Sequence, residues 1–114
     1  MKCVITGSAG FIGSHLLKAL KNAGHEVIGL DNFSNPSFIT KETKYGDVRF
    51  PETLQEHILW ADIVFHLAAD ISVDRSIFFP KTTMDINLGG TLNVLELCLK
   101  YNKRIIFASS SEIY

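Results

Sequence analysis

Three glycines close to the N-terminus are spaced as a phosphate-binding turn requires. Gly7, Gly10 and Gly13 follow a short apolar run at residues 3–5 and precede an amphipathic run at residues 12–23. Gly7 lets the chain turn sharply, Gly10 lets a pyrophosphate approach the backbone, and Gly13 lets a helix lie close to a sheet. The spacing therefore predicts a strand, a glycine-rich turn and a helix, the order that a dinucleotide-binding fingerprint needs.

The first turn of that helix supplies free hydrogen-bond donors. The backbone N–H groups of Phe11 and Ile12 are expected to point at the phosphates, with the helix dipole behind them. An ordinary strand, turn and helix without a ligand is the alternative interpretation. The acidic residue Asp31, at the end of the second apolar run, argues against that alternative.

Asp31 stands where the ribose of an adenosine would need a carboxylate. It ends the apolar run 25–31, 24 residues after Gly7. A carboxylate there accepts hydrogen bonds from both ribose hydroxyls and repels a 2′-phosphate. Since no arginine lies in the stretch directly after it, the residues predict NAD rather than NADP as the cofactor. The alternative is an aspartate that only caps a turn at the end of a strand.

Two later strand ends carry residues that suit the rest of a dinucleotide. Asp47 ends a short strand at residues 44–47 and could bind the amino group of adenine, although a Gly-Asp turn is also a common structural feature. The sequence His-Leu-Ala-Ala at residues 66–69 ends another strand, and its small residues would let a dinucleotide lie against the backbone. His66 itself is predicted to be a packed strand residue and not a catalytic base.

Apolar runs of strand length alternate with helical patterns along the whole chain. This alternation predicts an α/β fold: a Rossmann-type, doubly wound parallel sheet with right-handed crossovers, helices on both faces and the strand order 3-2-1-4-5. The ligand crevice is expected at the carboxyl ends of the first and fourth strands, where the order reverses. The expected strands are 2–6, 25–31, 44–47, 62–67 and 104–108, and the expected helices are 12–23, 51–59 and 81–102, with a helical turn or two at 71–79.

The composition fits one globular domain over residues 1–114. The net charge of −1 gives no reason to expect nucleic acid or an anionic membrane as a partner. No run approaches the roughly 20 apolar residues of a membrane span, so a cytoplasmic protein is expected. Cys3 and Cys98 have neither C-x-x-C spacing nor histidines placed for a metal, which predicts two buried, reduced thiols and no metal site.

Six motifs, found in one order along the chain, resemble those of the extended short-chain dehydrogenase/reductase family. More narrowly, they resemble the NAD-dependent nucleotide-sugar epimerases and dehydratases of that family. The motifs are TGSAGFIG at 6–13, DN at 31–32, GDV at 46–48, HLAA at 66–69, NLGGTLNVLE at 87–96 and SSSEIY at 109–114.

The resemblance implies a role for each matched residue. Asp47 and Val48 would contact the edge of adenine, and Asn87 would lie near the nicotinamide side of NAD. Ser110 would be the catalytic Ser/Thr whose hydroxyl hydrogen-bonds the sugar oxygen during hydride transfer. Glu112 stands where the dehydratases carry the base that removes the carbon 5 proton. The residues matched to cofactor contacts are Gly7, Gly10, Phe11, Ile12, Gly13, Asp31, Asn32, Asp47, Val48, Leu67, Ala68, Ala69 and Asn87.

The resemblance also implies that the chain is the N-terminal part of a longer enzyme. The family's acid/base tyrosine belongs to a Y-x-x-x-K motif, which would lie downstream of Tyr114 together with the region that binds the sugar nucleotide. The 114 residues alone are therefore expected to be inactive. The complete enzyme would act on a UDP- or dTDP-linked sugar and would form a homodimer through helices such as 81–102.

Two neighbouring activities and one function of another class fit these residues. An epimerase of the UDP-glucose 4-epimerase type, which transiently oxidises sugar carbon 4, is slightly favoured. A 4,6-dehydratase is the alternative: VDRSI at 73–77 and Glu112 resemble it, whereas Ser111 stands where glucose-type dehydratases carry an aspartate. Decarboxylases resemble the SEIY end and fit the stretch after His66 poorly. A non-catalytic NAD-binding module or truncated fragment is the third interpretation, because the chain contains no Y-x-x-x-K.

Overall fold

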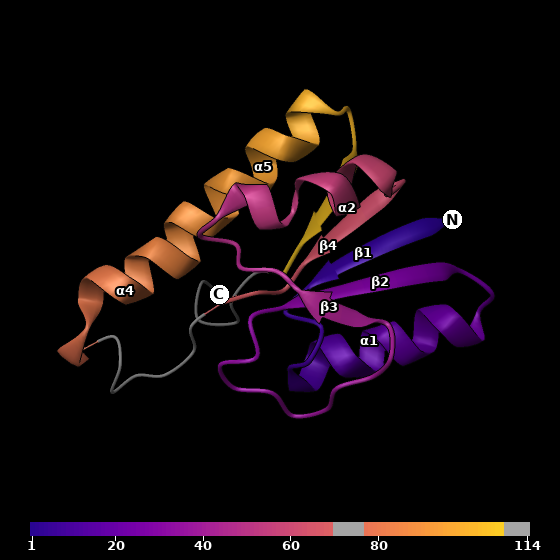
Figure 1. The fold of residues 1–114 in the computed structure, drawn as a ribbon, viewed down its shortest axis with the longest axis horizontal. Coiled ribbons are helices and arrows are strands. Elements are labelled where there is room, and N and C mark those ends of the chain that lie inside the picture. The colour runs from indigo at the N-terminus through magenta and orange to yellow at the C-terminus, as the bar shows by residue number, and fades with distance from the viewer. Residues whose placement is uncertain (70–76, 109–114) are drawn as a thin grey trace.

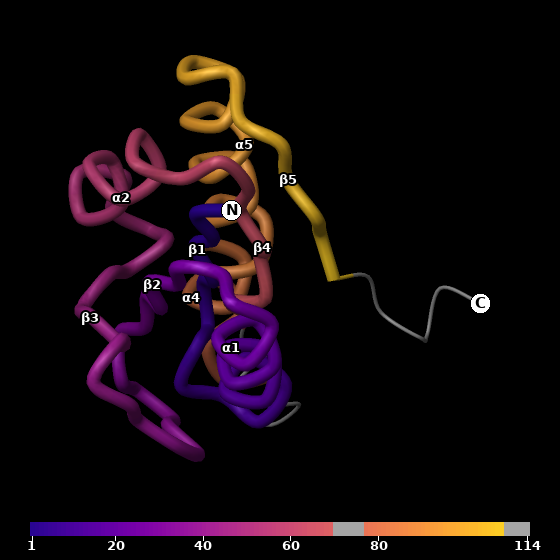
Figure 2. The backbone as a smooth tube through the Cα atoms, turned by 90° about the vertical axis from the view of Figure 1, so that its right-hand side faces the viewer, coloured from indigo at the N-terminus to yellow at the C-terminus, as the bar shows by residue number. Residues whose placement is uncertain are grey.

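Five parallel strands form one sheet in the order β3-β2-β1-β4-β5, as predicted (Figure 1). The computed structural model describes residues 1–69 and 77–108. β3 and β5 are the two edges of the sheet and lie on opposite sides of the view in Figure 2. The strands are β1 (Lys2–Thr6), β2 (Glu26–Asp31), β3 (Thr43–Tyr45), β4 (Ile63–His66) and β5 (Arg104–Phe107).

The register of the central strands brings their carboxyl ends to one level. Thr6, the last residue of β1, pairs with Leu30 of β2 and with His66 of β4. The strand order reverses at β1, so the connections that follow β1 and β4 leave the sheet on opposite faces. The turns after β1, β2 and β4 therefore meet at one edge of the sheet with a space between them.

Helices cover both faces of the sheet. α1 (Phe11–Asn22) packs on one face, whereas α2 (Gln55–Trp60) and α5 (Gly90–Lys100) pack on the other, with α4 (Pro80–Met84) prolonging α5 (Figure 1). A 3₁₀ turn, η1 (Pro51–Thr53), precedes α2, so the expected helix 51–59 is divided in two. Within residues 1–69 and 77–108, no helix has the length and apolar character needed to cross a bilayer.

Alternate side chains of the central strands build a core on each face. Val4 of β1 and Val64 of β4 are buried on the side of α2 and α5. Cys3 and Cys98 are free, buried thiols, as predicted, and burial raises the pKa of both. The cluster against α1 consists of Cys3, Ile5, Leu17, Val27 and Ile63.

The C-terminal helical segment is not the single helix expected over residues 81–102. A π-helical turn, η2 (Asp85–Gly89), separates α4 from α5, and the Gly90 N–H bonds back to the carbonyl of Asp85. Two adjacent glycines lower the helix propensity of this stretch, and the Thr91 hydroxyl donates to the Asn87 carbonyl at 2.7 Å. Turns of this kind are frequent at functional sites. The expected helical turn at 71–79 falls mainly outside the described residues.

Candidate nucleotide-binding site

A cavity of about 700 Å³ lies at the carboxyl end of the sheet, where the turns after β1 to β4 meet. It is large enough for a nucleotide-sized ligand. A second hollow, of about 580 Å³, lies between α1 and residues 37–42, and Phe11 alone of the predicted residues lines it. The large cavity is lined by twelve of the predicted cofactor residues: Gly7, Gly10, Phe11, Ile12, Gly13, Asp31, Asn32, Asp47, Val48, Leu67, Ala68 and Ala69.

The turn after β1 leaves three backbone donors free. Gly7 has a φ of +72°, and a Cβ there would lie 2.8 Å from the nitrogen of Ala68, so the turn packs directly on the end of β4. A Cβ on Gly13 would lie 2.1 Å from the Gly7 carbonyl oxygen, so only glycine lets α1 begin so close to the turn. The N–H groups of Phe11, Ile12 and Gly13 have no acceptor among the residues that the structure describes. These donors and the helix dipole suit a pyrophosphate.

The Asp31 carboxylate ties β2 to the glycine turn and also lines the cavity. Its Oδ2 accepts the N–H of Ala9 at 3.0 Å, and its Oδ1 accepts the N–H of Phe33 at 2.8 Å. Each oxygen keeps a lone pair for a further donor, which suits the two ribose hydroxyls expected there. Phe33 has a φ of +62°, which is rare for a bulky residue, and its bond to Asp31 holds it in that conformation. Such conformations cluster at ligand sites.

The loop after β3 presents an acceptor and a donor side by side. Asp47 and Val48 are 3% and 5% exposed, and both line the cavity. Among the N–H groups from Asp47 to Phe50, that of Val48 alone has no acceptor in the described part of the chain. The other three bind the Thr53 hydroxyl, the Asp47 carboxylate and the Asp47 carbonyl. A carboxylate beside a free N–H matches the amino group and the ring nitrogen N1 of adenine.

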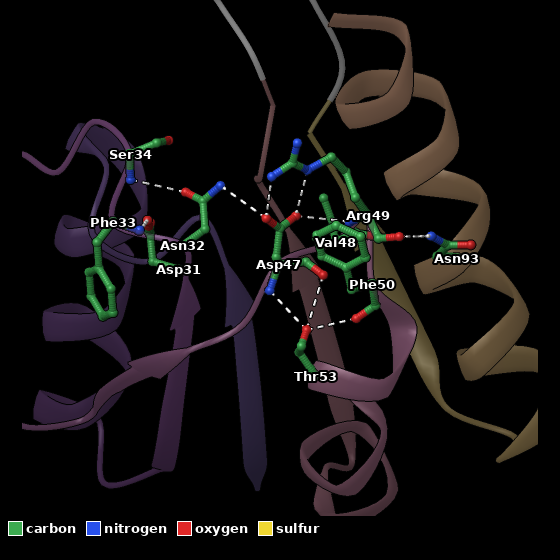
Figure 3. Close-up of polar contacts among 10 residues, drawn as sticks. All are labelled: Asp31, Asn32, Phe33, Ser34, Asp47, Val48, Arg49, Phe50, Thr53 and Asn93. Carbon is green, nitrogen blue, oxygen red and sulfur yellow. Dashed lines mark hydrogen bonds and ion pairs between the residues drawn. The ribbon is translucent and has the colours of Figure 1, made fainter. Parts of the chain in front are cut away.

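Arg49 forms a bidentate ion pair with Asp47 (Figure 3). Its Nε donates to Oδ1 at 3.1 Å and its Nη2 donates to Oδ2 at 2.7 Å. Hydrogen bonds from this guanidinium hold the pKa of the Asp47 carboxyl below its usual value, although burial opposes them. Asn32 adds a longer contact, with Nδ2 at 3.4 Å from Oδ2 of Asp47, and the Ser34 N–H fixes its amide. Asp47 is therefore ionised at neutral pH. Its Oδ1 already accepts two donors, so a further donor would bind at Oδ2, where the Asn32 contact is long.

His66 is a packed strand residue, as predicted, and it connects two walls of the site. It is 2% exposed. Its Nδ1 lies 2.7 Å from Oγ1 of Thr6, and its Nε2 lies 3.0 Å from Oγ1 of Thr91. Since Thr91 donates its own proton to the Asn87 carbonyl, it accepts the proton of His66 Nε2. The contacts thus run from β1 through β4 to η2.

The other end of this chain of hydrogen bonds fixes the charge of His66. Oγ1 of Thr6 accepts the N–H groups of Leu67 and Ala68, each at 3.1 Å, so its own proton is directed to Nδ1 of His66. The imidazole is therefore neutral, with its proton on Nε2. Burial lowers the pKa of His66 to about 4. The same threonine hydroxyl holds the two residues of the cavity wall that follow β4.

Asn87 is the one predicted cofactor residue that does not line the cavity. It is in η2 beside Ile86, which lines the cavity. Ser110 and Glu112 lie outside the described residues, so their expected roles stay predictions.

Sequence reasoning missed two residues of the site, Arg49 and Asn93. The contact of Arg49 with Asp47 could have been predicted locally, because Arg49 lies two residues after an aspartate, which is the spacing of an Asx turn. Asn93 had no local signal, because its side chain contacts the carbonyl of Val48, 45 residues away in sequence.

The fold and the cavity together define a doubly wound α/β domain of the Rossmann type. The parallel strand order, the glycine turn at its reversal and the carboxylate at the end of β2 are the features of that class. Residues 3–114 match a family described as "NAD dependent epimerase/dehydratase family". The chain belongs to this family.

Relatives of known structure or curated name differ in activity. UDP-N-acetyl-alpha-D-glucosaminuronate decarboxylase of Bacillus cytotoxicus is 38% identical over 120 residues, which cover 99% of this chain and 37% of the relative. UDP-glucose 4-epimerase of Caenorhabditis elegans is 35% identical over 100% of this chain and 39% of the relative. The crystal structure of the Thermus thermophilus UDP-glucose 4-epimerase in complex with NAD has a TM-score of 0.86 at 35% identity, over 96% of this chain and 38% of that chain. The chain thus spans under two fifths of each relative.

Proposed function

We propose that this chain is the NAD-binding part of an enzyme that acts on a nucleotide sugar, of the UDP-glucose 4-epimerase type. One observation carries the proposal: three groups that match the parts of NAD line one cavity. They are the N–H groups that begin α1, the Asp31 carboxylate and the N–H of Val48 beside Asp47; none of these N–H groups has an acceptor in the described part of the chain. They fit the pyrophosphate, the ribose and the adenine edge, in that order. The solved relative with NAD supports the choice of cofactor.

The residues of the chain would bind and orient the cofactor. When bound, NAD supplies an acceptor for the hydride of sugar carbon 4. The N–H groups of α1 would hold the pyrophosphate, and residues 67–69 would form the wall beside it. Asp31 would accept the ribose hydroxyls and exclude a 2′-phosphate by charge repulsion. Ser110 stays the residue proposed to hydrogen-bond the sugar oxygen, and Glu112 the base proposed if the enzyme is a dehydratase.

Decarboxylation is the second candidate activity. The relative that is 38% identical carries the name of a decarboxylase, which favours this activity. The stretch after His66, which fits the decarboxylases poorly, argues against it. The 4,6-dehydratase alternative depends on residues 73–77 and on Glu112, of which only Ile77 lies within the described residues. A non-catalytic NAD-binding module remains the alternative of another class.

We also propose that the complete protein dimerises through α4, η2 and α5. Four side chains spaced three or four residues apart leave a stripe of exposed apolar surface along this segment. They are Met84, Leu88, Leu92 and Leu95, which are 57%, 53%, 49% and 41% exposed. Two such stripes, packed against each other, would remove this surface from water.

Calorimetry and enzyme assays on the protein, as its source makes it, test the function. We expect NAD to bind at least tenfold more tightly than NADP, and UDP-glucose and UDP-galactose to interconvert. Carbon dioxide release from a UDP-uronic acid would replace the epimerase with a decarboxylase, and water loss from a dTDP- or UDP-hexose would replace it with a dehydratase. NAD binding without turnover of any of these sugars would favour the non-catalytic module. Absence of NAD binding would overturn the proposal.

A further inference from the structure

Asn93 of α5 reaches the loop that would read adenine. Its Nδ2 donates to the carbonyl of Val48 at 2.9 Å and to the carbonyl of Arg49 at 3.3 Å (Figure 3). An amide nitrogen carries two protons, so both bonds form at once. One side chain thus fixes two successive carbonyls of the loop at residues 46–50.

The loop's own hydrogen bonds set its shape but not its position. The Asp47 N–H binds the Thr53 hydroxyl, six residues further on, and the Asp47 carboxylate caps the turn that follows it. These local bonds would survive a rigid shift of the whole loop. On the side of β2, the Gly46 N–H donates to the Asp31 carbonyl at 3.0 Å, and Nδ2 of Asn32 lies 3.4 Å from Oδ2 of Asp47. On the opposite side, the polar attachment to α5 within residues 1–69 and 77–108 is Asn93.

The same face of α5 meets the loop through a glycine. A Cβ on Gly90 would lie 2.4 Å from Cγ2 of Val48, so the loop packs directly on the helix backbone. Asn93 lies three residues after Gly90 and therefore on the same face. Packing is non-directional and sets the distance between loop and helix, whereas hydrogen bonds are directional and set the orientation of the peptide groups.

We propose that Asn93 is a positioning residue that aims the Asp47 carboxylate and the Val48 N–H at the edge of adenine. Val48 lies between two peptide groups: the one before it carries the free N–H, and the one after it carries the carbonyl held by Asn93. Fixing that carbonyl restricts rotation about the Val48 backbone and so fixes the direction of its N–H. The inference rests on the proposed NAD site and adds the residue on which selectivity for the base depends.

Hypoxanthine is the base that tests this arrangement. Adenine offers a donor at its amino group and an acceptor at N1, which complement a carboxylate and an N–H. Hypoxanthine offers a carbonyl oxygen and a protonated N1, so both complementary contacts are lost. The dinucleotide with hypoxanthine in place of adenine keeps the ribose, pyrophosphate and nicotinamide of NAD. The ratio of the two affinities therefore measures reading of the base edge alone.

The experiment titrates NAD and its hypoxanthine analogue into the wild-type protein and into Asn93→Leu, by calorimetry. We expect the wild type to prefer NAD about tenfold or more, since two hydrogen bonds, one of them to a charged group, depend on the base. Asn93→Leu should lower this preference to about twofold or less, chiefly by weakening NAD. Asn22→Leu is the matched control: Asn22 is an exposed asparagine of α1 with no polar contact in the described chain, and its loss should leave the preference unchanged. Asn93→Ala, which favours the helix, replaces Asn93→Leu if melting curves show that the leucine variant is unfolded.

The outcomes separate the positioning role from a structural one. If both affinities fall in parallel in Asn93→Leu and the preference stays at the wild-type value, Asn93 only stabilises the fold and the inference is wrong. If the wild type binds both dinucleotides equally, the base edge is not read and the inference is also wrong, whereas the NAD site survives. If the wild type binds neither dinucleotide, the proposed function itself has failed.

Discussion

The carboxylate of Asp31, at the end of β2, accepts the backbone N–H of Ala9 in the turn after β1 at 3.0 Å. A residue expected to hold the ribose thus also holds the turn expected to bind the phosphates. The turn is attached to β2 a second time, because the Gly7 N–H donates to the Leu30 carbonyl at 2.8 Å. The turn is therefore fixed by the neighbouring strand without a ligand.

Replacing Asp31 should weaken NAD binding strongly. In Asp31→Ala the ribose hydroxyls lose a charged acceptor and the Ala9 N–H loses its partner, so we expect a loss of about 1–3 kcal/mol in binding free energy, measured by calorimetry. Asp62→Ala is a matched control, since Asp62 also accepts a β1 backbone N–H, that of Lys2, but at the far end of the strand. An unchanged NAD affinity in Asp31→Ala would assign Asp31 a structural role only.

Removing the guanidinium of Arg49 should destabilise the fold. In Arg49→Met the buried Asp47 carboxylate loses its charged partner, and we expect the free energy of unfolding to fall by about 1–2 kcal/mol in urea titrations. Solvent screening limits this loss, because the Arg49 side chain is 34% exposed. Arg104→Met removes an exposed arginine of β5 and should change stability little. In the double variant Asp47→Asn, Arg49→Met, the loss should be smaller than the sum of the two single losses.

The fold and much of the cavity could be predicted from local sequence patterns. Each of these signals is carried by neighbouring residues: the apolar runs of β1, β2 and β4, and the spacing of the glycines. Strands that alternate with helices predict a parallel sheet with right-handed crossovers, and the glycine turn after β1 places the reversal of strand order there. The interruption of the last helix by η2 had only a weak signal, since adjacent glycines within a helical pattern indicate lower propensity and not a π-turn. The contact of Asn93 with Val48 had none, because it joins segments brought together only by the completed sheet.

Acid should lower the stability of the fold, because unfolding lets the buried His66 take up a proton. The folded state keeps His66 neutral down to a pKa of about 4, whereas the unfolded chain binds a proton at about the ordinary value of 6.5. Between these values the unfolded state binds more protons, so stability is present above pH 6.5 and falls as pH drops toward 4, by up to about 3 kcal/mol. Urea titrations at a series of pH values measure the slope. His66→Gln should lose this part of the slope, and His15→Gln, at an exposed histidine of α1, should keep it; equal slopes in all three proteins would contradict the prediction.

Replacing Ser8 by alanine should stabilise the protein. The Ser8 hydroxyl is buried against Gly29 and has no hydrogen-bond partner among the described residues. Removing an unpaired buried hydroxyl should raise the free energy of unfolding by about 1 kcal/mol, measured by thermal or urea unfolding. Ser14→Ala makes the same change at a buried serine whose hydroxyl donates to the Phe11 carbonyl at 3.1 Å, and it should gain less. A loss of stability in Ser8→Ala would show that the Ser8 hydroxyl is satisfied in solution.

Charges on the exposed leucine stripe should dissociate the proposed dimer. We expect the complete protein to sediment as a dimer, and the variant Leu88→Glu, Leu92→Glu to sediment as a folded monomer, because both side chains already face solvent within one chain. Leu59→Glu, on the exposed face of α2, should leave the dimer intact. A monomeric wild type would end this proposal.

The central position of β1 has a consequence for the order of folding. Thr6 needs Leu30 on one side and His66, 60 residues further along the chain, on the other. Pairing over such distances forms slowly, because a long loop must close before any contact compensates its lost entropy. During synthesis, β1 thus leaves the ribosome before either of the strands that it pairs with, and its pairing with β4 completes later than its pairing with β2. Until residues 67–69 have emerged, the glycine turn has no opposite wall, and nascent chains that end before them should not retain NAD at the proposed site.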